Sequence, residues 1–525
     1  MWRLASPESN EAVAAPPHSG DSSLATGTAP PGHAESIVGA GARVVETIQT
    51  VLTALILAFV FRAFMIEAFI IPTGSMAPAL LGMHGVLRCP ECGASSDFGP
   101  VGTSQVNDPL FRPPQMAFCP NCRRYSPLPP ESPPRAGDRI LVHKWPYLLG
   151  GWFGPRRWDV IVFRDPADPQ TNFIKRLIAL PGETVEIIDG DVYIDGRIAP
   201  KSAAAQSALW APVFSQDLLP ADAPPRWLAP DRAADAAGWS GLDTRVLRYR
   251  AADATPRTLT FDSGLGGAYF RDVAAYNSEF IDRYKGGAPR AFVGDVRLLT
   301  EFVAVGGDGT LELSIDHHER RFVATFARNG DVRLDLTGIE GESATWKGRV
   351  RPFVDGRARA IEFGHVDRRA YVRVDGWPVV QTDESGYACD VRLLRRQRRH
   401  RPIELSLIGA GLSFDLRRLR IERDVHYTYE ESDTRRAFAG SPFMLGPDAY
   451  FVMGDNSSNS HDSREWTRFG SRLEGRYERG EYQIGTVPAD QIVGRAFLVY
   501  LPGLLPVDER GRWGIPDLGR VRFIR

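Results

Sequence analysis

The sequence predicts a mainly β protein that follows one N-terminal apolar helix. Three observations predict this fold class: an apolar run over 47–66, alternating strands with tight turns over 137–197, and short strands at regular spacing over 245–429. A chain of 525 residues is long enough for about three domains. Its composition, 43% hydrophobic and 24% charged, is that of globular proteins, which excludes a collagen-like or wholly disordered chain.

The charge balance and the number of cysteines exclude some classes of function. The 63 basic and 64 acidic residues give a net charge of −1, which offers no reason to expect nucleic acid as a partner. Lysine is rare among the basic residues, and a lysine, unlike an arginine, can lose its proton inside a protein. A lysine within a chemical motif therefore attracts notice. The 5 cysteines are too few for a disulfide scaffold in so long a chain.

The N-terminal part is predicted to hold a disordered tail and a membrane helix. Residues 1–42 are rich in Ala, Ser, Pro and Gly, without the early apolar core of a cleavable signal peptide. The next segment, 43–66, is predicted to form a transmembrane helix, because its apolar run would be about 30 Å long as a helix. A buried core helix is the alternative. The arginines around the run do not set an orientation.

Three separate segments, 67–88, 137–197 and 441–525, are predicted to build one β core. The second contains strand patterns separated by Asp-Gly turn signals, and similar strand patterns occur in the third. The block between them, 198–440, reads as an inserted β-sandwich-like domain. A smaller insertion over 89–136 combines paired cysteines with a Pro-rich linker.

Two core segments carry residues suited to nucleophilic chemistry. Ser75 follows Gly74, which permits a tight turn in which the hydroxyl and the amide of Ser75 could both face a substrate. Lys175 lies mid-strand among apolar residues, where alternation can turn it inward while Arg176 turns outward. Burial would lower the pKa of such a lysine, and a neutral amine can take a proton from serine. Taken singly, an exposed turn serine and a solvated lysine are the alternatives.

A dense polar loop over 454–464 follows an apolar strand in the third core segment. Asp462 and Arg464 are spaced for a local salt bridge, and Ser460 could orient a lysine amine. His461 is interpreted as a surface residue and not as a member of a catalytic triad. Taken alone, the loop is typical of a hairpin connection.

Together, the three pieces closely resemble bacterial type I signal peptidases, which are membrane-anchored Ser/Lys endopeptidases. The resemblance covers about 45–88, 137–197 and 441–505, less than half of the chain. Its motifs are specific because several occur in the family's order behind an apolar helix. They are IPTGSMAP, GDRILVHK, DVIVFRDP, IKRLIALPGETV, GDNSSNSHDSR and VPADQIVGRAFLVYLP.

The resemblance implies the catalytic residues. Ser75 falls on the family's nucleophile and Lys175 on its general base. Thr73 falls on the hydroxyl residue that forms the oxyanion hole with the Ser75 amide, although most members have serine there. The implied reaction is attack of Ser75 on the scissile carbonyl, with Lys175 taking the hydroxyl proton, and then hydrolysis of the acyl-enzyme. The resemblance implies no cofactor for this chemistry.

The polar loop has implied roles too. Ser460 falls on the serine that hydrogen-bonds the lysine, and Asp462 and Arg464 fall on the pair that supports the loop. Between Trp466 and Val487 this chain has extra residues where the family runs on almost directly. This departure places an added loop near the edge of the expected active site.

The resemblance also implies substrate and location. Substrates would be secretory preproteins with small residues at −1 and −3, bound as an added strand in shallow pockets. The protein would be a single-pass protein of the cytoplasmic (inner) membrane, with its catalytic domain outside the cytoplasm and the lipid bilayer as a partner. The 1–42 tail would then be cytoplasmic.

The smaller insertion resembles a zinc ribbon. Its four cysteines form two CPxC pairs, Cys89 with Cys92 and Cys119 with Cys122, separated by 26 residues. Four thiolates at this spacing suit a tetrahedral zinc ion, and four protein ligands would make the site structural. Disulfides in an oxidising compartment are the alternative. The fifth cysteine, Cys389, is expected to be a buried single thiol.

The larger insertion resembles laminin-G or concanavalin-like sandwiches over about 290–425. Such a domain could bind carbohydrate or protein, or it could be a spacer. His317 and His318 are interpreted as residues of its hairpin turns and not as metal ligands. A second function therefore stays open, that of an inactive peptidase-like membrane protein that binds through its lectin-like insertion. The presence of Ser75, Lys175 and Ser460 argues against it.

An apolar loop within the core, LLGGWF at 148–153, allows two interpretations. An exposed Trp152–Phe153 pair could dip into a bilayer, or the loop could form a corner of the core.

Overall fold

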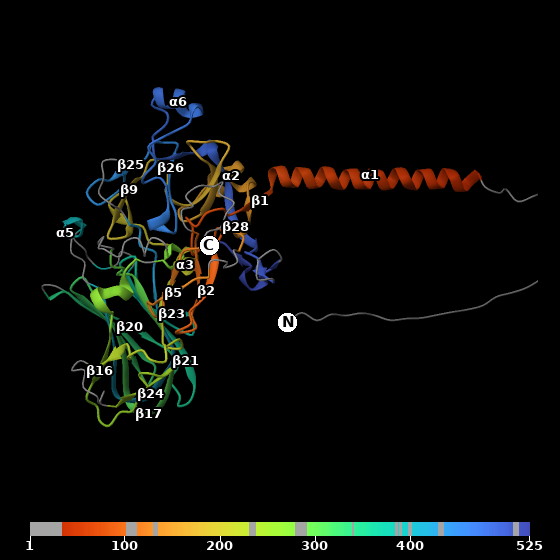
Figure 1. Ribbon diagram of the computed structural model, residues 1–525. Coiled ribbons are helices and arrows are strands. Elements are labelled where there is room, and N and C mark those ends of the chain that lie inside the picture. Colours follow the sequence, from red (N-terminus) through yellow and green to blue (C-terminus); the bar gives the residue numbers. More distant parts are fainter. Residues whose placement is uncertain are drawn as a thin grey trace, which may run out of the picture. The chain divides into compact units, whose positions relative to one another are not determined.

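The computed structural model describes most of the chain (Figure 1). The described residues are 34–100, 113–129, 135–229, 238–272, 274–278, 291–338, 341–383, 387, 391–396, 402–428, 435–507 and 514–525. The chain divides into two compact units, one that ends at Phe61 and one over Arg62–Arg525. Strands dominate the second unit, so the prediction of a mainly β protein is confirmed.

The helix α1 spans Ala34–Phe64. It begins earlier than predicted, so the part of the expected disordered tail over 34–42 is helical, while 1–33 lie outside the described residues. No proline stands between Pro31 and Pro72, and the backbone can therefore continue as a helix through this stretch.

The apolar run inside α1 exposes several large side chains. Leu57 and Phe59 are 63% and 65% exposed. A membrane-crossing helix must be both long enough and apolar along its whole span. Within the part of the chain that the structure describes, no helix meets both conditions. The predicted transmembrane helix over 43–66 is therefore not supported.

An eight-stranded antiparallel sheet joins the three segments that were predicted to form the core. Its strand order is β1-β6-β28-β7-β8-β26-β27, and β31 pairs with β28 beside this path. The strands are β1 (Ile66–Ile70), β6 (Arg139–His143), β7 (Val160–Arg164), β8 (Asn172–Ala179), β26 (Ala449–Met453), β27 (Val487–Pro488), β28 (Ile492–Leu501) and β31 (Arg522–Phe523). Strands more than 270 residues apart in sequence thus become neighbours, as β8 and β26 do, roughly at the ladder spacing of 4.8 Å.

A four-stranded sheet packs against this core. Its order is β11-β10-β9-β25, with β9 (Thr184–Ile188), β10 (Asp191–Ile194), β11 (Arg197–Ile198) and β25 (Phe443–Met444). The turns between them contain Asp189-Gly190 and Asp195-Gly196, all with positive φ, which two-residue hairpins require. The predicted Asp-Gly turns are confirmed.

The four paired cysteines lie at the ends of two small hairpins. One consists of β2 (Gly85–Arg88) and β3 (Ser95–Phe98), and the other of β4 (Met116–Phe118) and β5 (Tyr125–Pro127). Each CPxC motif forms the turn of one hairpin, so both pairs of sulfurs are presented from tight backbone turns.

The larger insertion contains a thirteen-stranded sheet. Its strands are β12 (Ala211–Ser215), β13 (Trp227–Leu228), β14 (Trp239–Ser240), β15 (Val246–Tyr249), β16 (Arg257–Phe261), β17 (Val296–His317), β18 (Arg320–Ala327), β19 (Asp331–Thr337), β20 (Ser343–Arg349), β21 (Ala358–Val366), β22 (Arg369–Val374), β23 (Trp377–Gln381) and β24 (Glu404–Arg423).

Two long strands, β17 with 22 residues and β24 with 20, run through this sheet. The first part of β17 pairs with β21 and its last part with β18, so two branches of strands leave it and enclose one apolar core. The expected short strands are therefore partly wrong. Glycines near the middle of β17 and repeated register shifts against β24 let one strand bend where two were expected.

Short helices and 3₁₀ turns connect the strands. The helices are α2 (Trp145–Leu149), α3 (Ala203–Leu209), α5 (Val391–Arg396) and α6 (Ser471–Glu478). The 3₁₀ turns are η1 (Gly151–Phe153), η2 (Leu265–Phe270), η3 (Ala275–Asn277), η5 (Ser457–Asn459), η6 (Ala489–Gln491) and η7 (Leu518–Arg520). A last strand pair, β29 (Leu505–Pro506) and β30 (Gly514–Ile515), follows β28. Trp152 in η1 is 85% exposed, so the 148–153 loop is not a core corner.

Candidate active site

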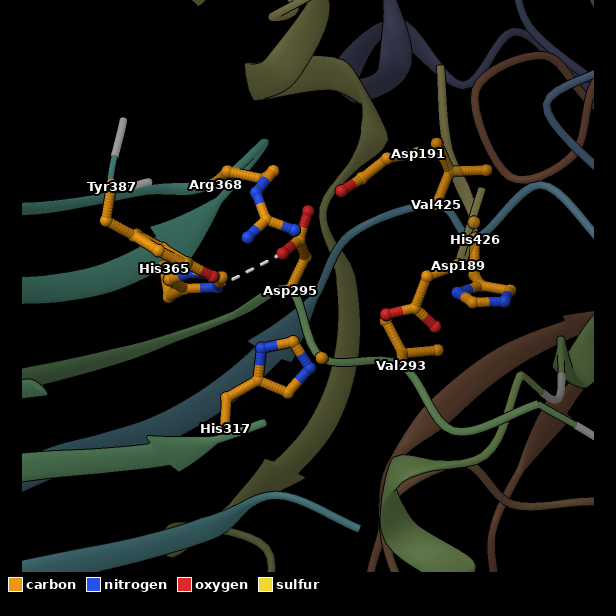
Figure 2. Close-up of a pocket in the computed structure, with 12 residues that line it drawn as sticks. Asp189, Asp191, Val293, Asp295, His317, His365, Arg368, Tyr387, Val425 and His426 are labelled. Carbon is orange, nitrogen blue, oxygen red and sulfur yellow. Dashed lines mark hydrogen bonds and ion pairs between the residues drawn. The ribbon is translucent and has the colours of Figure 1, made fainter. Parts of the chain in front are cut away.

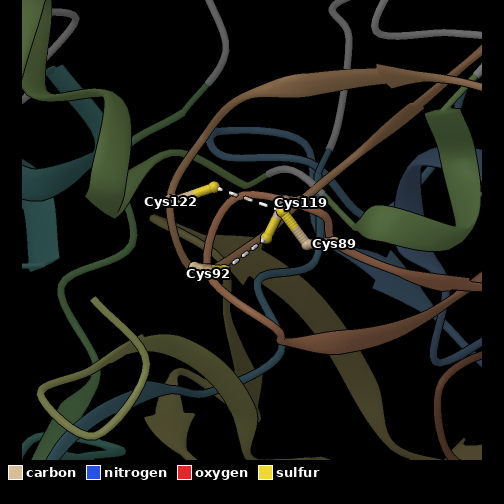
Figure 3. Close-up of side chains that lie close together, drawn as sticks. All are labelled: Cys89, Cys92, Cys119 and Cys122. Atoms are coloured by element: carbon tan, nitrogen blue, oxygen red, sulfur yellow. Dashed lines mark hydrogen bonds between the residues drawn. The ribbon is translucent and has the colours of Figure 1, made fainter. Parts of the chain in front are cut away.

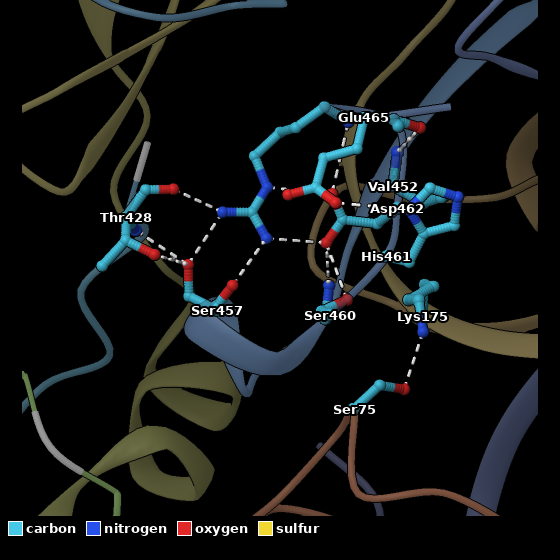
Figure 4. A network of polar contacts seen from close by, with 12 residues as sticks. Ser75, Lys175, Thr428, Val452, Ser457, Ser460, His461, Asp462 and Glu465 are labelled. Atoms are coloured by element: carbon cyan, nitrogen blue, oxygen red, sulfur yellow. Dashed lines mark hydrogen bonds and ion pairs between the residues drawn. The ribbon is translucent and has the colours of Figure 1, made fainter. Parts of the chain in front are cut away.

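Ser75 and Lys175 meet in the core. Ser75 lies in the loop after β1, and Lys175 lies in the middle of β8. The Lys175 Nζ donates a hydrogen bond of 2.7 Å to the Ser75 Oγ (Figure 4). Both side chains are buried, at 9% and 5% exposure. The structure therefore joins, across 100 positions of sequence, the two residues that the sequence predicts as nucleophile and base.

The surroundings of Lys175 favour its neutral form. Burial, the largest effect, lowers the pKa of the Lys175 ammonium to about 8. The Asp462 carboxylate opposes this shift, and the Arg464 guanidinium adds to it. Near pH 8 about half of the lysines are thus neutral, in hydrogen-bond reach of a serine hydroxyl.

Arg176 does not turn outward as predicted. It is fully buried, and its guanidinium makes two bonds of 2.7 Å to the Asp455 carboxylate. β8 is an inner strand of the sheet and its last six residues are all buried, so a charge on either face needs a partner. This bidentate pair ties β8 to the start of the 454–464 loop.

A buried charge pair supports that loop. Asp462 accepts bonds of 2.9 and 2.8 Å from the Arg464 guanidinium and one of 3.0 Å from the Gly454 amide. Burial raises the pKa of Asp462, but Arg464 and these hydrogen bonds hold it below its ordinary value. Arg464 also bonds to Ser457 and to the Thr428 carbonyl (Figure 4). The predicted Asp462–Arg464 salt bridge is present in the structure.

Ser460 lies in the same network but differs from its implied role. Its hydroxyl donates a bond of 2.8 Å to Asp462. Among the hydrogen bonds of the described residues, none joins Ser460 to Lys175. A Cβ on Gly454 would overlap with both the Ser460 Oγ and the Ser75 carbonyl oxygen, so Ser460 lies close to the nucleophile loop. Only glycine fits at position 454, a requirement that the sequence pattern did not reveal.

Thr73 and His461 differ in how far their side chains are exposed. Thr73 is half-buried in the loop that carries Ser75, and no hydrogen bond among the described residues joins its hydroxyl to Ser75 or Lys175. His461 is 67% exposed and pairs with Glu465 at 3.2 Å. The interpretation of His461 as a surface residue agrees with this position.

Asn456 is a site residue that the sequence did not single out. Its backbone amide donates 3.0 Å to the Ser75 carbonyl, and its side-chain amide donates 2.9 Å to the Gly74 carbonyl. It is 3% exposed. Asn456 therefore holds the backbone of the nucleophile through the two carbonyls that flank the Ser75 Cα. Its signal in the sequence is weak, because an asparagine in a polar loop is commonplace.

The four paired cysteines converge at one point (Figure 3). The sulfurs of Cys89 and Cys122, and those of Cys92 and Cys119, lie 3.6 Å apart, and all four sulfurs lie within 4.8 Å of one another. These distances are too long for disulfides, whose S–S bond is about 2.05 Å. Cys389 lies outside the described residues.

A second polar pocket lies where the insertion meets the β9–β10 hairpin (Figure 2). Its lining includes Asp189, Asp295, His317, His365 and His426. His365 pairs with Asp295 at 3.2 Å, and the next residue after His317, His318, pairs with Asp189 at 2.6 Å. His318 lies in the turn between β17 and β18, as expected. The pocket could not be predicted from the sequence, because its residues come from several segments spread over more than 200 positions.

Parts of the chain match a known protein family. The family described as signal peptidase, peptidase S26, matches residues 131–218 and 409–501. These segments contain Lys175 and the 454–464 loop. Ser75 lies outside them.

Curated relatives match shorter stretches. Signal peptidase I of Rickettsia bellii (strain OSU 85-389) is 26% identical over 140 residues, which is 27% of this chain and 36% of the relative. Signal peptidase I of Rickettsia prowazekii (strain Madrid E) is 46% identical over 43 residues, 8% of this chain and 16% of the relative. The chain spans about a third of the length of the first of these relatives.

Solved structures resemble this chain weakly. The carbohydrate binding module CBM66 from Bacillus subtilis covers 38% of this chain and 96% of its own, with a TM-score of 0.23 and 10% identity. Sheep galectin-11 covers 25% of this chain and 91% of its own, with a TM-score of 0.18 and 15% identity. These scores are too low to relate the chain to either protein. The family and the curated matches together relate the part that carries Lys175 and the 454–464 loop to the type I signal peptidases.

Proposed function

We propose that this protein is a serine endopeptidase that removes N-terminal signal peptides from secretory preproteins, with Ser75 as nucleophile and Lys175 as general base. One observation carries the proposal: the Lys175 Nζ lies 2.7 Å from the Ser75 Oγ, and Lys175 is buried. A nucleophile in hydrogen-bond reach of a base with a lowered pKa is the arrangement that acyl transfer requires. The family match supports the same reaction class.

In the proposed reaction, neutral Lys175 takes the Ser75 proton while the Ser75 Oγ attacks the scissile carbonyl carbon. The Ser75 amide and the Thr73 hydroxyl would stabilise the oxyanion, and loss of one such donor typically costs roughly 10²–10³ in rate. The Lys175 ammonium then gives its proton to the leaving amine. A water activated by Lys175 hydrolyses the acyl-enzyme and frees Ser75.

The proposed substrates carry small residues at −1 and −3 before the cleaved bond. This proposal rests on the resemblance of the core motifs to the family and on the family match. Small side chains suit shallow pockets beside a substrate that binds as an extended strand.

The test is cleavage of a preprotein in detergent micelles by the full-length wild type, Ser75→Ala and Lys175→Arg. Arginine keeps the charge but cannot act as a base, so both variants should be inert while the wild type cuts after a small-x-small motif. His461→Ala is the control, since that exposed side chain lies in the 454–464 loop of the site without a proposed role. An active Lys175→Arg variant would overturn the mechanism. A wild type that cleaves no preprotein would instead favour the binding function of the insertion.

A structural zinc ion on Cys89, Cys92, Cys119 and Cys122 is part of the proposal. Sulfurs at about 2.3 Å from a tetrahedral centre lie about 3.8 Å apart, close to the 3.6 Å between the paired sulfurs here. Such an ion would hold the two hairpins together and take no part in catalysis. Metal analysis should find one zinc per chain, which Cys89→Ser with Cys122→Ser removes. A stoichiometry unchanged by these substitutions would contradict this site.

The proposed location is the cytoplasmic membrane, with the catalytic part outside the cytoplasm. The exposed apolar side chains of α1 and the exposed Trp152 support contact with lipid. Flotation with lipid vesicles and protease accessibility of intact cells would test it. Recovery of the full chain with soluble proteins after cell lysis would contradict it.

A further inference from the structure

A short stretch of the larger insertion, Ala275–Ser278, lies against the nucleophile loop. The Tyr276 hydroxyl donates 2.7 Å to the Met83 carbonyl, and the Tyr276 carbonyl accepts 2.8 Å from the Gly99 amide. The Tyr276 ring lies so close to Gly74 that a Cβ there would overlap with it. This stretch therefore contacts the residue that directly precedes the nucleophile.

The next residue, Asn277, pairs with the asparagine that holds the nucleophile. The Asn277 Nδ2 donates 2.7 Å to the Asn456 Oδ1, and the Asn456 Nδ2 donates 2.9 Å to the Asn277 Oδ1. Asn277 also bonds to Ser458 and Asn459, and it is 5% exposed. The two amides thus form a buried reciprocal pair between the insertion and the 454–464 loop.

This pairing fixes which way the Asn456 amide faces. A side-chain amide has two N–H donors and one carbonyl acceptor. In Asn456, one N–H is used on Asn277 and the other on the Gly74 carbonyl, while the Asn456 oxygen accepts from Asn277. A reversed amide would set two oxygens against each other at Asn277 and again at Gly74.

We propose that Asn277 is a positioning residue for the proposed peptidase reaction, because it orients the Asn456 amide that holds the Ser75 loop against Lys175. The inference rests on the proposed function and extends it. The larger insertion then supplies a residue on which catalysis depends, and it is more than a spacer or a separate binding domain.

The consequence for rate follows from the geometry of the nucleophile. The Ser75 Oγ must keep its 2.7 Å contact with Lys175 and its line of attack, and a misplacement of about 1 Å can cost about 10² in rate. Asn277 is only 5% exposed, so it offers little surface to a bound substrate. Loss of Asn277 should therefore lower kcat by about 10- to 100-fold and change KM by less than about twofold.

The experiment measures kcat and KM for preprotein cleavage by the full-length wild type, Asn277→Ala, Asn277→Asp, Asn456→Ala and the double variant with alanine at both positions. Aspartate keeps the shape of Asn277 but cannot donate to Asn456, so its kcat should fall as for alanine. Asn329→Ala is the control, because Asn329 lies in the same insertion and bonds to Asp331 within its own turn. Thermal unfolding shows that each variant is folded at the assay temperature.

The double variant decides whether Asn277 acts through Asn456. If it does, the kcat of the double variant should lie within about threefold of that of Asn456→Ala alone. Losses that multiply, or an Asn277→Asp variant with the kcat of the wild type, would overturn the inference. An inert wild type together with an inert Asn329→Ala variant would count against the proposed function itself.

Discussion

Lys175 is buried at a cost to stability. In the unfolded chain its pKa is near 10.5, and in the fold it is about 8. The difference corresponds to about 3 kcal/mol by which the fold disfavours the charged form. This loss of stability accompanies a neutral amine beside Ser75, and functional sites commonly combine lower stability with a shifted pKa.

The pKa of Lys175 predicts how activity depends on pH. Only neutral Lys175 can take the Ser75 proton, so kcat/KM should rise with pH and level off above about 8. Below that pH it should fall about tenfold per unit, as expected for one ionising group. A pH profile of preprotein cleavage measures this. A profile that falls as pH rises through 8 would be incompatible with Lys175 as the base.

Lys175→Met should make an inactive but more stable protein. At pH 7 the wild type carries the buried ammonium, so the variant should gain up to about 3 kcal/mol of unfolding free energy. The wild-type penalty shrinks as pH rises from about 8 to 10.5 and is absent above it, so the gain should shrink as well. Urea unfolding at about pH 7 and pH 10 tests both statements. Equal gains at both pH values would contradict the burial argument, and Lys347→Met at an exposed position is the control.

At the scale of elements, the sequence was sufficient to predict the conformation wherever one short stretch determines it. The Asp189-Gly190 turn needs two residues with positive φ, and the Asp-Gly pair alone predicts it. The Lys175 strand and the 454–464 loop were equally visible, because apolar alternation and polar clustering are local patterns. The approach of Ser75 to Lys175 came from the family resemblance.

Other features depend on partners that are distant in sequence, and these were missed. Arg176 is buried because Asp455 pairs with it across 279 positions. Asn277 pairs with Asn456 across 179 positions. In neither case does the local sequence name the partner, so neither contact could be predicted from it. Ser460 shows the same limit, because its hydroxyl bonds to Asp462 instead of the lysine.

The path of the 454–464 loop depends on Gly454. A Cβ on Gly454 would overlap with the Ser460 Oγ and the Ser75 carbonyl oxygen, so Gly454→Ala must move the loop, the nucleophile or both. We expect preprotein cleavage to fall by about 10² or more, because catalytic geometry tolerates little displacement. Gly446→Ala is the matched control, since its nearest neighbours would lie 3.9 Å from the added Cβ. Equal rates for the two variants would show that the loop tolerates the displacement.

At the scale of the whole molecule, a buried ion cluster joins the core to the larger insertion. Lys201 follows β11 and is 6% exposed. Its ammonium pairs with Asp367, in the turn after β21, and at 2.7 Å with Asp424, just after β24. Burial raises the pKa of Asp424 to about 6 even though Lys201 opposes the shift. One lysine therefore balances two carboxylates at the point where the insertion leaves and rejoins the core.

Removal of that lysine should weaken the molecule as a whole. Lys201→Met leaves Asp367 and Asp424 buried without a cation, which typically costs about 3–5 kcal/mol. These carboxylates can be neutralised by protons, and the fold already raises the pKa of Asp424, so the loss should shrink as pH falls from about 7 to 5. Calorimetry at both pH values, with Lys347→Met as the exposed control, measures the loss and shows whether core and insertion still unfold in one transition. If Lys201→Met were as stable as the control at pH 7, the insertion would be held to the core by its other contacts, and Asn277 could reach Asn456 without this ion cluster.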